Sequence, residues 1–210
     1  MLADNFIVFE GIDKAGKSTQ IELLKSSPFA EKFFFTSEPT SFPTGKFLRS
    51  MLKGDFAVDA RTSAFLFAAD RSEHVWGSEE NSIHSQLKQG KVVISDRYFF
   101  SSLAYQSVDC SEKLPRALNS FFPLPVLLFF FAIEPEIALS RIGNRQTTEI
   151  YEKLDFLGET ETQYEKIINE YESPEKNEGM KIVRLDASKP KEQVHQIILS
   201  EIKKLPIFEK

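Results

Sequence analysis

The sequence predicts a three-layer α/β/α fold in which helices flank a five-stranded parallel sheet. Short apolar segments alternate with longer segments of helical period along the chain, which is the order of elements in such folds. Most of the apolar segments lack the polar alternation of half-exposed strands. A chain of 210 residues, 41% of them hydrophobic, can bury one sizeable core, so we expect a single domain over 1–210.

The five predicted strands are short apolar runs. They cover Phe6–Glu10, Phe33–Thr36, Val92–Ser95, Val126–Ala132 and Lys181–Leu185. The first four are continuously apolar, which indicates strands buried on both faces. The fifth mixes charged with apolar residues, so we expect it at an edge of the sheet.

The predicted helices separate these strands and follow the last one. They cover Lys17–Ser26, Thr44–Lys53, Ala60–Val75, Glu79–Gln89, Ser101–Gln106, Glu112–Phe121, Pro135–Arg145, Tyr151–Glu172 and Lys191–Lys204. Gly90 is a predicted C-cap, and Ser188-Lys189-Pro190 opens the last helix. The most polar stretches, 143–150 and 173–179, are predicted as loops, the first of them within a short lid at about 141–156.

Composition narrows the class of protein. A net charge of -5 argues against broad nucleic-acid binding, which normally needs a basic face. The single cysteine, Cys110, excludes an internal disulfide and a cysteine metal cluster, as is typical of proteins from a reducing cytoplasm. The most apolar segment, Phe121–Ile133, is too short to span a bilayer, and no targeting signal is visible. We therefore expect a cytoplasmic protein without nucleic-acid or membrane partners.

The segment Gly11-Ile12-Asp13-Lys14-Ala15-Gly16-Lys17-Ser18 fits the phosphate-loop pattern G-x-x-x-x-G-K-[ST] without deviation. It lies between a predicted strand and a predicted helix, where backbone N–H groups converge on phosphate oxygens. Lys17 would reach the β and γ phosphates of ATP, and the Ser18 hydroxyl would ligate Mg²⁺. An ordinary glycine-rich turn is a much weaker interpretation. The sequence has no Asn-Lys-x-Asp segment, which disfavours a GTPase.

A second constellation, Asp96-Arg97, follows the predicted strand Val92–Ser95. The carboxyl ends of strands are where open α/β sheets bind ligands. Asp96 can hold the water shell of Mg²⁺, and Arg97 can bridge donor and acceptor phosphates. A strand-end salt bridge between these two residues is the alternative.

Together these motifs resemble those of the thymidylate kinases, P-loop enzymes that transfer a phosphoryl group from ATP to dTMP. The resemblance covers nearly the whole chain. Its landmarks are 9–19 (FEGIDKAGKST), 36–39 (TSEP), 65–71 (FLFAADR), 96–98 (DRY) with 101–106 (SSLAYQ), and the late segment 185–188 (LDAS). It implies ATP, Mg²⁺ and dTMP as ligands, and a homodimer built through the region of Ala60–Val75 and Ser101–Phe121.

The resemblance also implies the site residues. Those on the ATP side are Gly11, Ala15, Gly16, Lys17, Ser18, Thr19, Arg141 and Arg145. Those on the dTMP side are Asp13, Glu38, Pro39, Arg49, Phe67, Arg71, Arg97, Ser101, Ser102, Tyr105 and Gln106. The implied catalytic residues are Lys17, Lys14, Arg97 and Asp13, and the implied metal-site residues are Ser18 and Asp96.

Three acceptor residues have roles that physical chemistry supports. Phe67 would stack on the thymine ring. Arg71, one helical turn further on, would donate to a thymine carbonyl. Tyr105 would crowd the sugar C2′ and disfavour a ribose hydroxyl. A core phenylalanine and a solvated arginine are the plainer alternatives for the first two.

The chain departs from the common bacterial pattern in three places. Ser37 stands where an arginine is usual, so Arg49 or Lys46 would have to supply the acceptor-side cation. The segment Thr40-Ser41-Phe42 replaces Gly-Gly-Thr, which predicts a stiffer acceptor loop. In the lid, Ile150 replaces an expected arginine. We therefore favour Lys14 as the extra cation on the transferred phosphoryl group, with Arg145 assisting.

Two alternatives remain open from the sequence. One is a kinase for another nucleoside monophosphate or for a deoxynucleoside. A deoxynucleoside kinase would need a carboxylate base such as Glu10 or Glu38. The other is a nucleotide-binding regulator that has lost catalysis.

Overall fold

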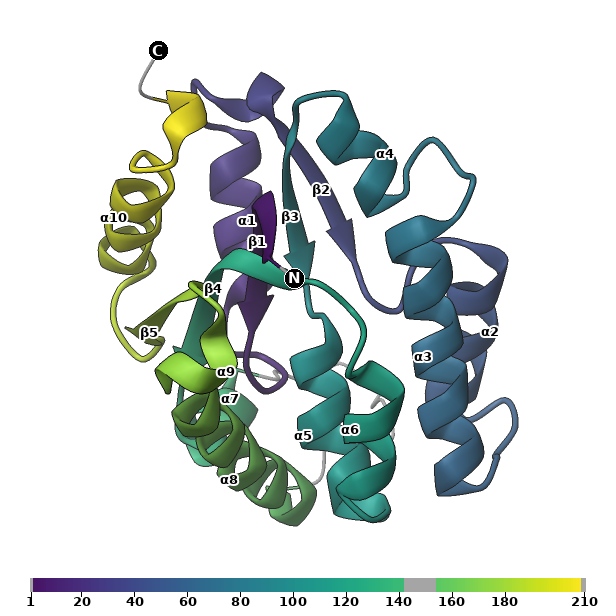
Figure 1. Ribbon diagram of the computed structural model, residues 1–210. Coiled ribbons are helices and arrows are strands. Elements are labelled where there is room, and N and C mark those ends of the chain that lie inside the picture. Colours follow the sequence, from purple (N-terminus) through teal and green to yellow (C-terminus); the bar gives the residue numbers. More distant parts are fainter. Residues whose placement is uncertain (1, 142–153, 209–210) are drawn as a thin grey trace.

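The computed structural model describes residues 2–141 and 154–208. Within them lies one five-stranded parallel sheet with the order β2-β3-β1-β4-β5 (Figure 1). The strands are β1 (Leu2–Glu10), β2 (Phe33–Ser37), β3 (Val92–Asp96), β4 (Leu124–Ala132) and β5 (Lys181–Asp186). All five predicted strands are confirmed, as is the sheet flanked by helices.

Ten α-helices are assigned in the described residues. They are α1 (Lys17–Lys25), α2 (Pro43–Leu52), α3 (Ala60–Trp76), α4 (Ile83–Lys88), α5 (Phe99–Asp109), α6 (Lys113–Asn119), α7 (Pro135–Ser140), α8 (Leu154–Tyr171), α9 (Pro174–Asn177) and α10 (Lys191–Ile202). Short 3₁₀ helices cover Ala30–Lys32 and Pro206–Phe208. Helix α1 packs beside α10, α5 packs against α8, and α2 and α3 form a pair at one side of the molecule (Figure 1).

The core lies on the central strands. Residues 6–9 of β1 and residues 92–94 of β3 are fully buried. Much of the phenylalanine content is also here: Phe9 packs edge-on against Phe129, with 5.4 Å between ring centroids. Continuous apolar strands are therefore buried on both faces where they are central, as expected for a parallel sheet.

The two edges of the sheet differ in how well the sequence predicts them. Strand β5 is an edge, as its mixed composition predicts. Strand β2 is the other edge, and after Phe33 its residues are only half buried. The expectation that it is buried on both faces is therefore wrong. The apolar pattern does not reveal this edge position, because the strand contains three consecutive phenylalanines. Their large rings pack against neighbours even where the strand is open to solvent.

Several helix boundaries differ from those predicted. Helix α5 runs from Phe99 to Asp109 and is longer at both ends than Ser101–Gln106. Helix α4 is shorter than Glu79–Gln89, because Ser82 caps its start through the backbone N–H of Ser85. The predicted polar loop 173–179 contains the short helix α9, which begins at Pro174. Proline suits the first helical turn, where its missing N–H has no partner to lose.

The central part of the predicted lid, 142–153, lies outside the described residues, and with it Arg145 and Ile150. In the described part of the chain, no helix combines the length and the apolar composition needed to cross a bilayer.

Candidate active site

The site lies at the carboxyl edge of the sheet, where β1 and β3 end side by side. Phe9 pairs with Asp96 in the parallel register, so the phosphate loop after β1 and the Asp96-Arg97 pair after β3 emerge together. Parallel strands bring the chain segments that follow them to one edge, which explains why motifs about 80 residues apart form one site.

The phosphate loop is built around two glycines with positive φ. Gly11 has φ 139°, and a Cβ there would lie 2.7 Å from the backbone oxygen of Phe131 on β4. Gly16 has φ 101° and is the N-cap of α1. Larger side chains would clash at the first position and strain the second, so the loop can close over a ligand only with glycine there.

Lys17 lies on the first turn of α1 and folds back over the loop. Its Nζ donates to the carbonyl oxygens of Gly11 at 2.8 Å and Ile12 at 2.9 Å. Burial and the nearby Arg97 lower the pKa of Lys17 to about 8. The direct partners of the ammonium group are neutral carbonyl oxygens, whereas a bound phosphate would place full negative charge beside it.

A cleft of about 680 Å³ lies over this loop. Six of the eight predicted ATP-side residues line it; Gly11 does not, and Arg145 lies outside the described residues. It is lined by Asp13, Lys14, Ala15, Gly16, Lys17, Ser18, Thr19, Gln20, Asp96, Arg97, Phe131, Arg141, Ala187, Lys189, Lys191 and Val194. Arg141, one of the six, donates to the carbonyl oxygens of Lys14 and Ala187.

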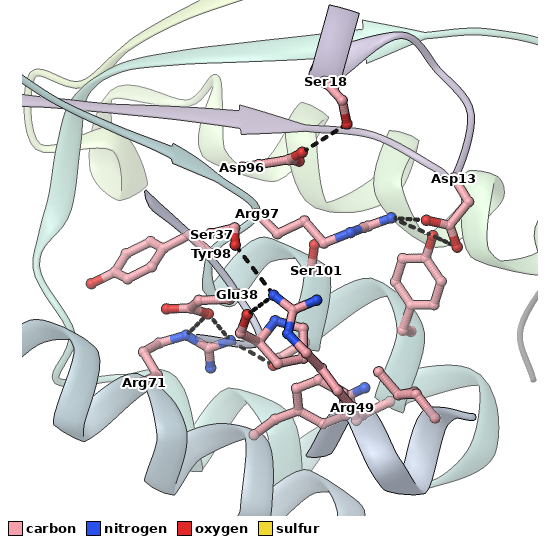
Figure 2. A pocket seen from close by; sticks show the side chains of 16 residues that line it. Asp13, Ser18, Ser37, Glu38, Arg49, Arg71, Asp96, Arg97, Tyr98 and Ser101 are labelled. Atoms are coloured by element: carbon pink, nitrogen blue, oxygen red, sulfur yellow. Dashed lines mark hydrogen bonds and ion pairs between the residues drawn. The ribbon is translucent and has the colours of Figure 1, made fainter. Parts of the chain in front are cut away.

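The predicted metal-site residues face one another. The Ser18 hydroxyl lies 3.4 Å from Oδ2 of Asp96 (Figure 2). The other carboxylate oxygen of Asp96, Oδ1, is buried and has no hydrogen-bond partner among the described residues. A buried oxygen of this kind is costly unless a cation or a water molecule completes it.

A second cavity, of about 290 Å³, opens next to the first. Every predicted acceptor residue lines it (Figure 2). The lining residues are Asp13, Ser18, Ser37, Glu38, Pro39, Arg49, Leu52, Phe67, Arg71, Asp96, Arg97, Tyr98, Ser101, Ser102, Tyr105 and Gln106.

Arg97 lies where the two cavities meet. Its guanidinium pairs with Asp13 and donates to the hydroxyls of Ser101 at 3.0 Å and Tyr105 at 3.2 Å. Its backbone adopts φ 74°, an unfavourable region for a residue with a side chain, immediately after β3. Burial would raise the pKa of Asp13, but Arg97 and Lys17 outweigh that effect and hold it below its ordinary value. Asp13 is thus an ionised partner for Arg97.

Glu10, the last residue of β1, binds the segment that follows Arg97 and so holds it in place. It is fully buried, and its Oε1 accepts from the backbone N–H groups of Tyr98 at 2.7 Å and Ser101 at 3.2 Å. Its Oε2 accepts from the hydroxyls of Ser101 at 2.7 Å and Tyr164 at 2.8 Å. Burial raises the pKa of Glu10, although Arg97 acts in the opposite direction. All its oxygens are engaged, so it is a structural anchor for the start of α5.

Arg71 is not a solvated helix arginine: only 1% of it is exposed. Its Nε donates to Glu38 at 2.8 Å, and Glu38 also contacts Nδ1 of the buried His74 at 3.0 Å. The hydroxyl of Thr36 completes this chain at Nε2 of His74, 2.7 Å away. Phe67, one turn before Arg71 on α3, lines the same cavity, as its spacing predicts.

Arg49 lies next to Ser37, the position where an arginine is usual. Its guanidinium donates to the Ser37 hydroxyl at 3.3 Å and to the carbonyl oxygen of Pro39 (Figure 2). Arg49 lines the acceptor cavity, whereas Lys46 lines neither cavity. Of the two candidates for the acceptor-side cation, Arg49 is therefore the one in position.

The acceptor loop is held by Asp70 on α3. Its carboxylate accepts from the backbone N–H of Thr40 at 2.8 Å, from the Thr40 hydroxyl at 2.6 Å and from the Thr44 hydroxyl at 2.7 Å. A glycine at position 40 would lack the Thr40 hydroxyl and its bond to Asp70, which is consistent with the stiffer loop that the sequence predicts.

Sequence reasoning missed several residues that organise the site. They are Glu10 as an anchor, Asp70, His74, Asn119 and Tyr164. Three of them lie on the motif helices or strands, but Asn119 and Tyr164 come from α6 and α8 and have no local motif around them. Asp70 alone carried a signal, because a charged residue beside Arg71 in a helix rich in apolar residues is expected to be paired.

Comparison with known proteins gives a consistent result. Residues 9–198 match the family model described as thymidylate kinase. A protein of Malacoplasma penetrans named thymidylate kinase is 32% identical over 207 residues, covering 94% of each chain. Two further relatives carry that name as a provisional assignment. The one from Treponema pallidum is 38% identical over 95% of each chain, and the one from Methanocaldococcus jannaschii is 37% identical over 98% of this chain and 100% of its own.

A family match over most of the chain agrees with the geometry of the phosphate loop and of the two adjoining cavities. With relatives above 30% identity over nearly their full length, it shows that this chain belongs to the thymidylate kinase family.

Proposed function

We propose that this protein transfers the γ-phosphoryl group of MgATP to dTMP and so forms dTDP for dTTP synthesis. One observation carries the proposal: the cavity over the phosphate loop and the cavity lined by Phe67 and Arg71 share Asp13, Ser18, Asp96 and Arg97. Two ligands bound in these cavities would present their phosphates to one another across Arg97. Membership of the thymidylate kinase family supports the choice of dTMP as acceptor.

On the donor side, the residues fit a nucleoside triphosphate. The loop amides and Lys17 would bind its phosphates, with Lys17 exchanging the carbonyl oxygens of Gly11 and Ile12 for phosphate oxygens. Arg141, which bridges the phosphate loop and Ala187, would cover the nucleoside end. Lys14, an exposed residue of the loop, is the cation we assign to the transferred phosphoryl group. Arg145, its proposed assistant, lies outside the described residues.

The buried oxygen of Asp96 that has no partner in the described part of the chain fits a hydrated Mg²⁺ beside Ser18. When bound there, Mg²⁺ would neutralise charge on the phosphates of ATP. Asp96 would hold its water shell, and the Ser18 hydroxyl would be a direct ligand.

On the acceptor side, Phe67 would stack on the thymine ring and Arg71 would donate to a ring carbonyl. Burial raises the pKa of Tyr105, so its hydroxyl stays protonated and donates to Asp13 at 3.3 Å. This bond holds the phenol ring where it would crowd a 2′-hydroxyl. Arg49 would bind the acceptor phosphate in place of the missing arginine at position 37.

Catalysis would rest on alignment and charge. The acceptor phosphate is already an anion at neutral pH, so the reaction needs no strong general base. Arg97, held by Asp13, Ser101 and Tyr105, would stabilise the charge that develops between donor and acceptor. Because the two cavities meet at Arg97, donor and acceptor phosphates would face one another, and the transfer would be a direct, in-line displacement.

The deoxynucleoside kinase alternative is not favoured. Such an enzyme needs a free carboxylate near the acceptor hydroxyl. Each carboxylate oxygen of Glu10 already accepts two hydrogen bonds. The two oxygens of Glu38 are bound by Arg71 and His74. Neither carboxylate is available as a base.

We further propose a cytoplasmic homodimer without nucleic-acid or membrane partners. Large apolar side chains are exposed on and near α3, with Phe65 at 55%, Trp76 at 46% and Phe121 at 62%. Trp76 and Phe121 stack at 6.0 Å between ring centroids. A second copy covering these rings would remove apolar surface that a monomer leaves in water.

An acceptor panel tests the proposed function. Purified protein with MgATP would be given dTMP, dUMP, dCMP, dGMP, UMP and thymidine, and nucleotide products would be separated by chromatography. We expect dTDP and ADP in equal amounts from dTMP and no product from thymidine. Lys17→Ala should abolish turnover, while Lys25→Ala, an exposed lysine on the same helix, should not. A preference for another acceptor would overturn the assignment, and binding of ATP without any transfer would support the regulator alternative.

A further inference from the structure

Arg71 is held in one orientation by several contacts around its guanidinium group. Its Nε lies 2.8 Å from Oε2 of Glu38, and its Nη2 lies 2.7 Å from the same oxygen. The Nη2 also donates to the Ser102 hydroxyl at 3.0 Å. The guanidinium carbon lies 5.7 Å from the ring centroid of Tyr98 and 5.6 Å from that of Phe122. Carboxylate, hydroxyl and rings thus fix the group on three sides.

The fourth contact comes from Asn119, at the end of α6. Its Oδ1 accepts from Nη1 of Arg71 at 2.5 Å. Asn119 is buried and does not line the acceptor cavity, whereas Arg71 does. Asn119 therefore contacts Arg71 from the side away from the acceptor cavity.

Asn119 is itself fixed in this orientation. Its Nδ2 donates to the carbonyl oxygen of Pro115, one turn earlier, at 2.7 Å. Arginine has only donors and a backbone carbonyl only accepts, so the reverse orientation of the amide would lose both bonds. The amide is thus a rigid acceptor for Arg71.

Counting hydrogens shows what these contacts leave. A guanidinium has five N–H bonds. Glu38 takes the hydrogen on Nε, Ser102 takes one from Nη2, and Asn119 takes one from Nη1, while Nη2 also forms the ion pair with Glu38. The remaining Nη1 hydrogen has no partner in the described part of the chain. It is a donor that Arg71 has left for a ligand.

We propose that Asn119 is a positioning residue for base selection: by occupying one Nη1 hydrogen of Arg71, it aims the other at the acceptor base. This inference rests on the proposed function and deepens it. A fixed N–H donor favours a base with a carbonyl at the matching ring position. It disfavours an amino group there, because two donors would then face one another in a buried site. Asn119 should therefore contribute to the choice of thymine or uracil over cytosine.

The test compares Asn119→Ala with Asn169→Ala. Asn169 is a matched control, since its Oδ1 also accepts from an arginine, Arg184 at 2.7 Å, but on the exposed side of α8. Steady-state constants would be measured for dTMP, dCMP and ATP. For Asn119→Ala we expect kcat/KM for dTMP to fall on the order of tenfold through KM. The preference for dTMP over dCMP should narrow, with KM for ATP unchanged.

Asn119→Asp guards against a variant that fails to fold. It retains the acceptor for Arg71 and replaces the donor to Pro115 with a second acceptor oxygen, so its preference for dTMP over dCMP should stay close to that of the unmodified protein. If Asn119→Ala matches Asn169→Ala, or if Asn119→Asp loses selectivity as fully as the alanine variant, the inference is wrong. Absence of dTMP phosphorylation by the unmodified protein would instead overturn the proposed function.

Discussion

The charge of Lys17 is weakly supported in the protein without a ligand. Its ammonium group is buried, and its direct partners are two carbonyl oxygens. Burial and Arg97 lower its pKa to about 8, so in the free protein a large share of Lys17 is neutral just above that pH. A triphosphate placed beside it would raise the pKa again, because negative charge favours the ammonium form. Binding of ATP and protonation of Lys17 should therefore be linked.

This linkage predicts a pH-dependent proton uptake. Below pH 8 Lys17 already carries its proton in the free protein, so ATP binding takes up little. As the pH rises above 8, binding should take up a growing fraction of a proton, and affinity should fall by up to about tenfold per pH unit. Calorimetry at pH 7 and pH 9 in buffers of different ionisation enthalpy measures this directly. Lys17→Arg, which stays charged, should show no such uptake, and its absence from the unmodified protein at pH 9 would disprove the assignment.

At the residue scale, the sequence predicts the side chains that would contact ligands. It does not predict the residues that hold those side chains in position. Lys17, Asp96 and Arg97 lie in motifs whose spacing reports their chemistry. Asn119 and Tyr164 belong to helices of ordinary composition, and only the packing of α6 and α8 brings them to Arg71 and Glu10. A buried polar contact between distant elements leaves no local pattern.

At the scale of elements, Glu10 joins three parts of the fold. It ends β1, accepts two backbone N–H groups at the start of α5, and binds the hydroxyl of Tyr164 on α8. Helix α8 begins at Leu154, within the last part of the predicted lid at about 141–156. A single carboxylate thus ties the central strand to the helix that carries Ser101 and to the helix that begins in the predicted lid.

Glu10→Gln should therefore destabilise the protein. An amide would place two hydrogens against groups that are donors to the carboxylate, leaving buried hydrogen bonds unmade at a cost of about 2–4 kcal/mol. Urea unfolding gives the loss of unfolding free energy.

Glu22→Gln is the control, because Glu22 lies exposed on α1 in an i,i+3 pair with Lys25 and should change the unfolding free energy by no more than about 0.5 kcal/mol. Equal stability of the two variants would contradict the anchoring role of Glu10.

The elements also show where the sequence has limits. Apolar runs predict all five strands, because burial on both faces requires them. Helix α5 starts at Phe99, two residues before the predicted start at Ser101, because its first turn is capped by Glu10 from another element. Helix α9 could have been found, because Ser173-Pro174 is a recognisable start signal.

At the scale of the whole molecule, the exposed rings of α3 and of the segment before β4 bear on assembly. We expect Phe65→Glu to convert the proposed dimer to a monomer, because a carboxylate would be buried against apolar surface. Sedimentation velocity measures the mass of each variant. Ile197→Glu, with Ile197 42% exposed on α10, should leave the mass unchanged. A monomeric unmodified protein would contradict the dimer.

The meeting of the two cavities at Asp13 and Arg97 is the central feature of the molecule. It predicts direct transfer between two bound nucleotides, without a phosphorylated enzyme. The most direct test is the stereochemistry of transfer from ATP made chiral at the γ-phosphorus to dTMP. A single in-line displacement predicts inversion of configuration in dTDP. Retention would require two displacements and a covalent intermediate, and would contradict the account.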